Sequence, residues 1–157
     1  MVTGLAENSA HANYSLWGLT DPHAPVQASG EIDIAAGRER VWSVLADVMN
    51  WTRLRSDIES VRIDAPVASG VNAVLGTGGI ELQLTFGHVD APRELNWTTM
   101  TPGLVMTNRY VLVPVGDMTH VVSNETITAP DFPQFDKVEL TARIQVWLEA
   151  VKRVAEG

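Results

Sequence analysis

The chain has 157 residues, no cysteine, a formal net charge of −8, 45% hydrophobic residues and 19% charged residues. This composition is typical of one folded domain, and it excludes a disulfide framework, a thiolate nucleophile and a cysteine-based metal site. Its 11 Lys and Arg residues are spread out, which argues against a nucleic-acid surface, and neither a signal peptide nor a membrane span is evident, so we expect a cytoplasmic monomer or homodimer.

The sequence divides into three parts. Residues 1–12 are small and polar and are expected to form a flexible tail. Residues 13–30 include Trp17 and other apolar side chains, so this segment is expected to cover the domain, either as a lid or as a patch over an apolar surface. Residues 31–157 are expected to form the ligand-binding domain.

Periodicity predicts the elements of that domain. Residues 31–36 alternate as a strand, residues 38–49 have the apolar spacing of an amphipathic helix, and residues 51–58 suggest a second short helical turn. Short strands separated by tight turns follow, at residues 61–63, 73–77, 80–89, 95–100, 105–113 and 120–128. A long helix at residues 136–155 ends the chain. This order predicts an α+β fold, with an antiparallel sheet of about seven strands curved round one helix and a cavity inside.

Several short motifs resemble the polyketide cyclase/dehydrase group of the START-like, helix-grip (SRPBCC) superfamily. They are residues 31–36 (EIDIAA), 41–45 (VWSVL), Trp51, 56–58 (SDI), 91–97 (APRELNW), 101–103 (TPG), 116–117 with Thr119, 124–126 (NET) and 147–149 (WLE). The resemblance covers about residues 30–156 and implies a helix-grip fold. Leu54 and Asn108 depart from it, since the group often has a tryptophan and a histidine there.

The resemblance implies a cofactor-independent enzyme that binds a hydrophobic, polyketide-like molecule in an internal cavity and promotes cyclisation, dehydration or rearrangement. Because the superfamily also includes carriers, a non-catalytic binding protein is the alternative. A stress-response or chaperone-interacting module is a third interpretation, and it predicts a small or filled cavity with an exposed apolar patch. We expect no metal, because the four histidines lack metal-site spacing.

Strand parity sorts the candidates for the cavity wall into two faces. Met106, Asn108, Tyr110 and Leu112 share one face of their strand, and the resemblance favours that face, although the opposite face is nearly as apolar. Tyr110 could hydrogen-bond a carbonyl or enolate oxygen, or could simply pack in the core.

Glu125 is the strongest candidate for catalysis. On a cavity-facing strand its carboxylate would be desolvated, which raises the pKa toward the range of a general acid or base. The alternative is a solvated residue or an ion pair with Arg109. Asp57 is placed at the cavity mouth, or else caps a helix.

The remaining candidates would bind ligand. Trp17, Trp51 and Trp97 could stack on a flat molecule, and Thr141 and Gln145, four positions apart on the last helix, could form the pocket floor. Arg143 is expected to face water. The full ligand-binding set is Trp17, Trp51, Phe86, Trp97, Met106, Asn108, Leu112, Thr141 and Gln145.

Overall fold

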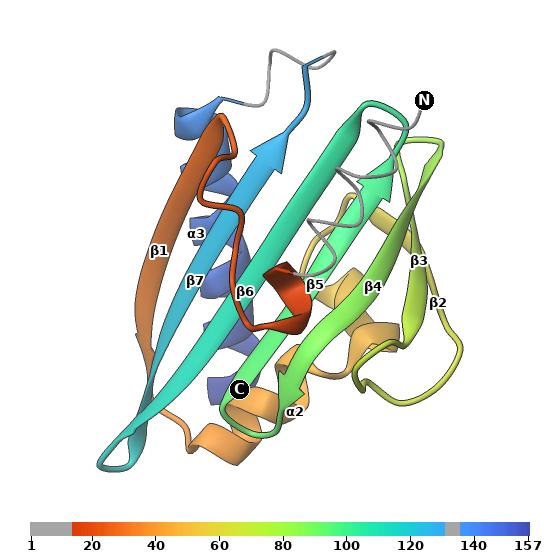
Figure 1. The fold of residues 1–157 in the computed structure, drawn as a ribbon. Coiled ribbons are helices and arrows are strands. Elements are labelled where there is room, and N and C mark those ends of the chain that lie inside the picture. The colour runs from red at the N-terminus through yellow and green to blue at the C-terminus, as the bar shows by residue number, and fades with distance from the viewer. Residues whose placement is uncertain (1–13, 131–135) are drawn as a thin grey trace.

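A computed structural model describes residues 14–130 and 136–157, so the tail predicted at residues 1–12 lies outside the described residues. Seven antiparallel strands form one curved sheet in the order β1-β7-β6-β5-β4-β3-β2 (Figure 1). The strands are β1 (Val26–Ile34), β2 (Ile58–Ile63), β3 (Asn72–Thr77), β4 (Ile80–Asp90), β5 (Glu94–Thr101), β6 (Leu104–Val115) and β7 (Met118–Thr128). The helices are α2 (Arg38–Leu45), the 3₁₀ helix η1 (Val48–Arg53) and α3 (Lys137–Glu156).

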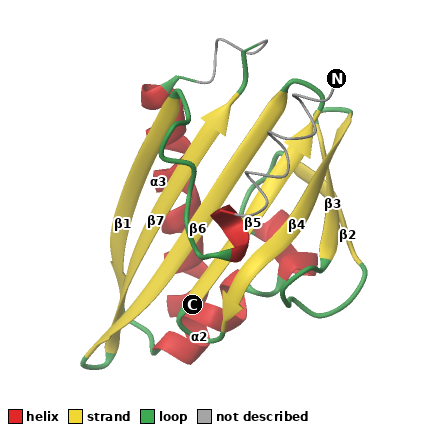
Figure 2. Ribbon diagram, viewed as in Figure 1, coloured by secondary structure: helices red, strands yellow, loops and turns green. Residues whose placement is uncertain are grey.

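The predicted α+β helix-grip fold is confirmed. α2, η1 and α3 lie on one face of the sheet (Figure 2), and α3 buries a stripe that includes Ile144, Trp147 and Val151. Asp136 caps the N-terminus of α3, because its carboxylate accepts a hydrogen bond from the backbone N–H of Glu139 at 2.8 Å. Of the described helices, none is both long and apolar enough to cross a membrane.

The first strand starts earlier than predicted, at Val26 instead of residue 31. Its first half carries small residues where an alternating strand would carry large apolar ones, and Ala28 and Gly30 are among them. A Cβ atom at Gly30 would lie 2.8 Å from Cγ2 of Ile144. Glycine at this position therefore allows α3 to pack closely against β1.

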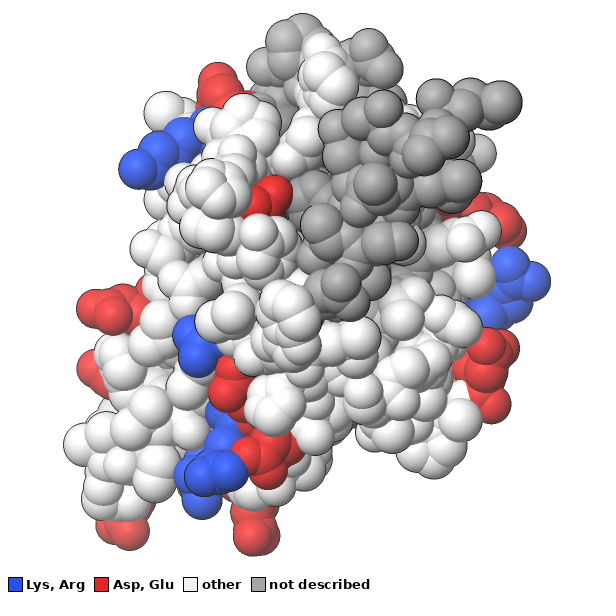
Figure 3. Space-filling view, viewed as in Figure 1, with Lys and Arg blue, Asp and Glu red and all other residues white. Residues whose placement is uncertain are grey.

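Residues 14–25 lie on the outer face of the sheet, on the side away from α3 (Figure 1). Ser15 is buried directly against Gly87, and Gly18 lies beside His88 and Glu94. The segment leaves Leu16, Trp17 and Leu19 exposed. Figure 3 shows this face, where charged side chains gather mainly toward the edges of the described surface. The segment thus covers the back of the sheet and does not contribute to the concave face, where α3 packs.

Candidate functional site

A narrow pocket of about 70 Å³, here called the inner pocket, lies on the concave face of the sheet. Its lining comes from η1 and the turn after it, from six strands and from α3. The lining residues are Trp51, Arg55, Ile58, Leu75, Leu82, Trp97, Thr99, Met106, Asn108, Tyr110, Glu125, Arg143 and Trp147. A second hollow of about 370 Å³, the outer cleft, shares Arg55 and Arg143 with the inner pocket. These two arginines therefore mark the junction between the two spaces.

Aromatic rings fill most of the space behind the pocket. The ring centre of Trp51 lies 5.1 Å from the ring centres of Trp97 and of Trp147, and 6.4 Å from that of Phe86. Trp97 in turn stacks on Tyr110, with 5.2 Å between ring centres and 12° between planes. Such offset and edge-to-face contacts add to the stabilisation from burial. They also leave only a small space for a ligand.

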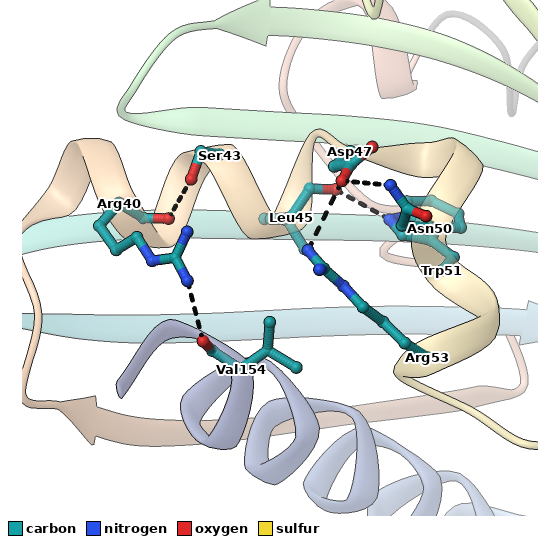
Figure 4. A network of polar contacts seen from close by, with 8 residues as sticks. All are labelled: Arg40, Ser43, Leu45, Asp47, Asn50, Trp51, Arg53 and Val154. Carbon is teal, nitrogen blue, oxygen red and sulfur yellow. Dashed lines mark hydrogen bonds and ion pairs between the residues drawn. The ribbon is translucent and has the colours of Figure 1, made fainter. Parts of the chain in front are cut away.

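Hydrogen bonds fix Trp51 at the centre of this cluster (Figure 4). Its Nε1 donates to the carbonyl oxygen of Leu45 at 2.9 Å. Around it, Asn50 donates to the Asp47 carboxylate at 2.7 Å, and Arg40 donates through Nη2 to the carbonyl of Val154 at 3.1 Å. These bonds tie α2 and η1 to each other and to the end of α3, so the wall of the pocket is anchored from behind.

Glu125 contributes the buried carboxyl group of the inner pocket. Only 8% of the residue is exposed. Burial raises the pKa of Glu125 from 4.5 to about 7, while the charges of Arg143 and Arg55 oppose the rise. Arg109 lies on the other face of the sheet, where its Nε donates to Glu94 at 2.9 Å, so the predicted alternative of an Arg109 ion pair is wrong. Glu125 is thus a group that can give or take a proton near neutral pH.

A directed chain of hydrogen bonds ends at Glu125. Trp97, Asn108 and Glu125 occupy directly opposed positions on β5, β6 and β7. An indole N–H can only donate, so Trp97 Nε1 sets the orientation of the Asn108 amide, whose Oδ1 accepts at 3.0 Å. The amide nitrogen then donates to the Glu125 oxygens at 3.1 and 3.2 Å. Asn108 therefore favours the ionised carboxylate.

Replacing Trp97 by Phe should raise the titration midpoint of Glu125 by about one pH unit. Phe keeps most of the packing but removes the N–H that orients Asn108, so the amide can turn its oxygen toward the protonated carboxyl. Carboxyl-carbon NMR across pH 5–9 would measure this. Trp147→Phe is the matched control, since Trp147 Nε1 has no hydrogen-bond partner within the described part of the chain. An unchanged titration midpoint of Glu125 in Trp97→Phe would contradict the proposed hydrogen-bond chain from Trp97 through Asn108 to Glu125.

Tyr110 supplies a neutral hydrogen-bond donor beside Asn108 and Glu125. It is buried, and burial together with the charge of Glu125 holds its pKa far above the ordinary value for tyrosine. The phenol therefore stays protonated at every working pH. Its hydroxyl can donate to a ligand oxygen but cannot act as a base.

Asp57 lies at the mouth of the site, in the lining of the outer cleft but not of the inner pocket. It accepts a hydrogen bond from Nε of Arg55 at 2.9 Å and also pairs with Nη2 of the same guanidinium. This hydrogen bonding with Arg55 lowers the pKa of Asp57. Asp57 is therefore a fixed anion that holds Arg55 in place, and its geometry is not that of a proton carrier.

The structure brings six of the twelve predicted site residues together in the lining of one pocket. Those that line the inner pocket are Trp51, Trp97, Met106, Asn108, Tyr110 and Glu125. Phe86 and Leu112 point to the same side but are buried in the core and are not part of the lining.

Three predicted residues lie elsewhere. Trp17 is 67% exposed on the outer face, since its segment packs on the back of the sheet. Thr141 borders a different hollow of about 330 Å³ near β1 and β7, one that Glu125 also borders, and Gln145 points toward Gly30. On α3 the pocket is lined instead by Arg143 and Trp147, two positions further along and so about 200° round the helix.

Sequence reasoning missed seven lining residues, which are Arg55, Ile58, Leu75, Leu82, Thr99, Arg143 and Trp147. Arg143 was expected to face water, and the other six were not among the predicted site residues. Trp147 had a usable signal, because it is a large aromatic side chain on the buried stripe of α3. The arginines carried none, since a charged residue beside a pocket has the same sequence context as one on the surface.

A larger hollow, of about 700 Å³, surrounds the turn between β5 and β6. Its described lining includes Met100, Pro102, Leu104 and Pro130, and Glu81 is the one titratable group among those residues. It is open to solvent and lies apart from the aromatic cluster. We therefore assign the functional site to the smaller, chemically richer inner pocket.

Comparison with known proteins identifies the family. The profile of the family described as "Polyketide cyclase / dehydrase and lipid transport" matches residues 25–156. This chain belongs to that family. The polyketide cyclase/dehydrase assignment agrees with the resemblance found in the sequence, and it makes this a ligand-binding SRPBCC protein. No curated protein sequence matches significantly.

Solved structures share the fold at low sequence identity. A hypothetical protein from Helicobacter pylori, jhp0584, is 13% identical with a TM-score of 0.73, and the match covers 85% of this chain and 90% of that one. Norcoclaurine synthase from Thalictrum flavum, solved with dopamine and hydroxybenzaldehyde, is 18% identical with a TM-score of 0.62, and the match covers 82% of this chain and 84% of that one. DynU16, a putative protein of the dynemicin biosynthetic locus, is 15% identical with a TM-score of 0.64, covering 81% of this chain and 46% of that chain. At these identities the likeness shows the fold alone, and the polyketide cyclase/dehydrase assignment rests on the family match.

Proposed function

We propose that this protein is a cofactor-independent enzyme that binds the carbonyl-bearing end of a partly apolar small molecule in the inner pocket and moves a proton with Glu125. The family supports a ligand-binding role. The observation that carries the catalytic proposal is a buried carboxyl with a pKa of about 7 in the lining of an aromatic pocket. A purely structural acid would gain nothing from this placement, since burial penalises its charged form.

The pocket supports proton transfer next to a carbonyl group. The Glu125 carboxylate takes a proton from the carbon beside the carbonyl, and the electron pair of the broken C–H bond forms an enolate. The Tyr110 hydroxyl donates to the enolate oxygen. The protonated Glu125 then gives its proton to a β-hydroxyl, which leaves as water while the carbonyl re-forms. Alternatively, the enolate carbon attacks a second carbonyl and closes a ring, and the protonated Glu125 gives its proton to the alkoxide oxygen formed there. Asn108 stabilises the carboxylate at the start of the cycle.

The pocket volume limits how the ligand binds. About 70 Å³ is well below the several hundred Å³ that usually enclose a drug-sized ligand. Only one end of a polyketide-like molecule fits beside Glu125, and the rest extends past Arg55 and Arg143 into the outer cleft. A linear chain meets this requirement, and a preformed polycycle does not.

Two other functions have specific support. A carrier would also use the stacked faces of Trp51, Trp97 and Trp147, and it would need no proton transfer. A stress-response or chaperone-interacting module would explain the small cavity together with the exposed Leu16, Trp17 and Leu19. Neither of them explains why a carboxyl is buried in the pocket, which is why we favour the enzyme.

Native mass spectrometry against linear and polycyclic polyketide-like compounds tests the proposal. We expect the wild type to retain a linear class and to release a dehydrated or cyclised product. Glu125→Gln should retain the same compounds without conversion, and Glu39→Gln, at an exposed acid of α2, should behave as the wild type. Retention without conversion by the wild type would make the protein a carrier. Retention of no compound would overturn both functions.

A further inference from the structure

Two arginines border the route that a ligand must take from the outer cleft to Glu125. Arg55 follows η1 and Arg143 lies on α3, so they come from two separate elements, and both line both spaces. The chain has only 11 basic residues and a net charge of −8. Two cationic side chains at the mouth of an otherwise aromatic pocket therefore point to the chemistry of the ligand.

The guanidinium of Arg55 is held with part of its donors unused by its partner. Asp57 takes the Nε and Nη2 edge, and a guanidinium has five N–H donors. The Arg55 side chain is 25% exposed, whereas that of Asp57 is 54% exposed. The ion pair thus has its acid toward solvent and its guanidinium toward the pocket, in a fixed orientation.

Arg143 adds a second positive charge at the same place. It is half-buried, and it lies close enough to Glu125 and to Asp57 to lower the pKa of both. The acids Asp57 and Glu139 border the outer cleft only. At the inner pocket, the titratable groups that accompany the two arginines in the described lining are Glu125 and Tyr110, and Tyr110 stays neutral.

We propose that the ligand is an oxo acid, whose ketone end enters the inner pocket and whose carboxylate binds between Arg55 and Arg143. This inference rests on the proposed function, because it takes Glu125 as the inner end of the site. A carboxylate matches the planar fork of a guanidinium in a bidentate way, and charge-assisted bonds of this type are stronger than neutral ones. Asp57 already shows that mode of binding on the other edge of Arg55.

The test compares 4-oxopentanoate with its neutral isostere 4-oxopentanamide. Titrations followed by the tryptophan indole N–H signals report where each probe binds. Trp51, Trp97 and Trp147 line the inner pocket, whereas Trp17 and Trp42 lie outside its lining and serve as internal references. We expect both probes to shift the signals of the three pocket tryptophans, and the acid to bind about tenfold more tightly than the amide.

Arginine variants decide the cause of that preference. Arg143→Gln should bring the affinity for the acid down to that for the amide, Arg143→Lys should keep part of the difference, and Arg153→Gln, at an exposed arginine in the last turn of α3, should keep all of it. An unchanged indole spectrum without ligand shows that each variant is folded. Equal binding of acid and amide, or a preference that survives in both Arg143→Gln and Arg55→Gln, would overturn the oxo-acid inference alone. If neither probe shifts the pocket tryptophans, the inner pocket is not the binding site and the proposed function fails with it.

Discussion

Replacing Glu125 by Gln should make the protein more stable than the wild type above pH 7, and the advantage should vanish below about pH 5. The pKa of Glu125 is raised from 4.5 to about 7 in the folded state, so between these pH values the folded protein holds a proton that the unfolded chain has lost. The free energy of unfolding of the wild type therefore falls as the pH rises from about 4.5 to about 7, and below this range the wild type keeps its full stability. Glutamine carries no charge to bury, and it can still accept from Asn108.

Above pH 7 the free energy of unfolding of Glu125→Gln should exceed that of the wild type by about 3 kcal/mol, because the pKa shift is from 4.5 to about 7 and each pKa unit corresponds to about 1.4 kcal/mol. Urea unfolding of both proteins at pH 5, 6, 7 and 8 measures it. The relevant quantity is the difference in the free energy of unfolding between Glu125→Gln and the wild type. His120 also makes the stability depend on pH, because its hydrogen bond to Asp33 raises its pKa, but it does so equally in both proteins. Glu39→Gln should show no such difference. A constant gap from pH 5 to 8 would mean that Glu125 is solvated.

Trp51→Ala is expected to cost about 3–5 kcal/mol of stability, the usual range for removing a buried large aromatic side chain. Trp51 is 1% exposed and contacts Phe86, Trp97 and Trp147. Its loss also leaves the carbonyl of Leu45 without the 2.9 Å bond that Nε1 supplied. The inner pocket becomes larger by the volume of the missing ring.

Thermal and urea unfolding would measure this loss, and added indole should restore part of it. Indole has the shape of the missing side chain, and a ligand that binds only the folded state raises its stability by mass action. Trp17→Ala is the matched control, and its stability should stay within about 0.5 kcal/mol of the wild type because Trp17 is mostly exposed. A small loss in Trp51→Ala with no response to indole would show that the aromatic cluster collapses into the gap.

The sequence was sufficient for the type and order of the elements, because most of them carry their own period, but not for the start of the first strand or for the position of the short helix, which is Val48–Arg53 instead of 51–58. Alternation located the strands, and the stripe of Ile144, Trp147 and Val151 located the last helix. The same stripe could not show where the pocket borders it, since Thr141 with Gln145 and Arg143 with Trp147 are equally good pairs by spacing. Only the packing of α3 on the sheet distinguishes them.

The candidate site was predictable residue by residue but not as an arrangement. Parity grouped Asn108 with Tyr110, and the family resemblance favoured their face as the cavity wall; the structure places both residues and Glu125 in the lining of the pocket. The bond from Trp97 through Asn108 to Glu125 depends on the register of three strands, which short-range pattern does not specify. Trp17 shows the opposite problem: apolar composition predicted that its segment packs on the domain, but it could not show on which face.

The strand order has a consequence for folding kinetics. From β2 to β7 each strand pairs with its neighbour in sequence, so these pairings close short loops. The exception is β1, where Val26 pairs with Ile127 almost at the other end of the chain. Closing so long a loop costs entropy before any contact compensates for it, and such non-local contacts slow folding. The meander is thus able to assemble before β1, and the strand that bears Glu125 is the one left as an open edge until β1 joins.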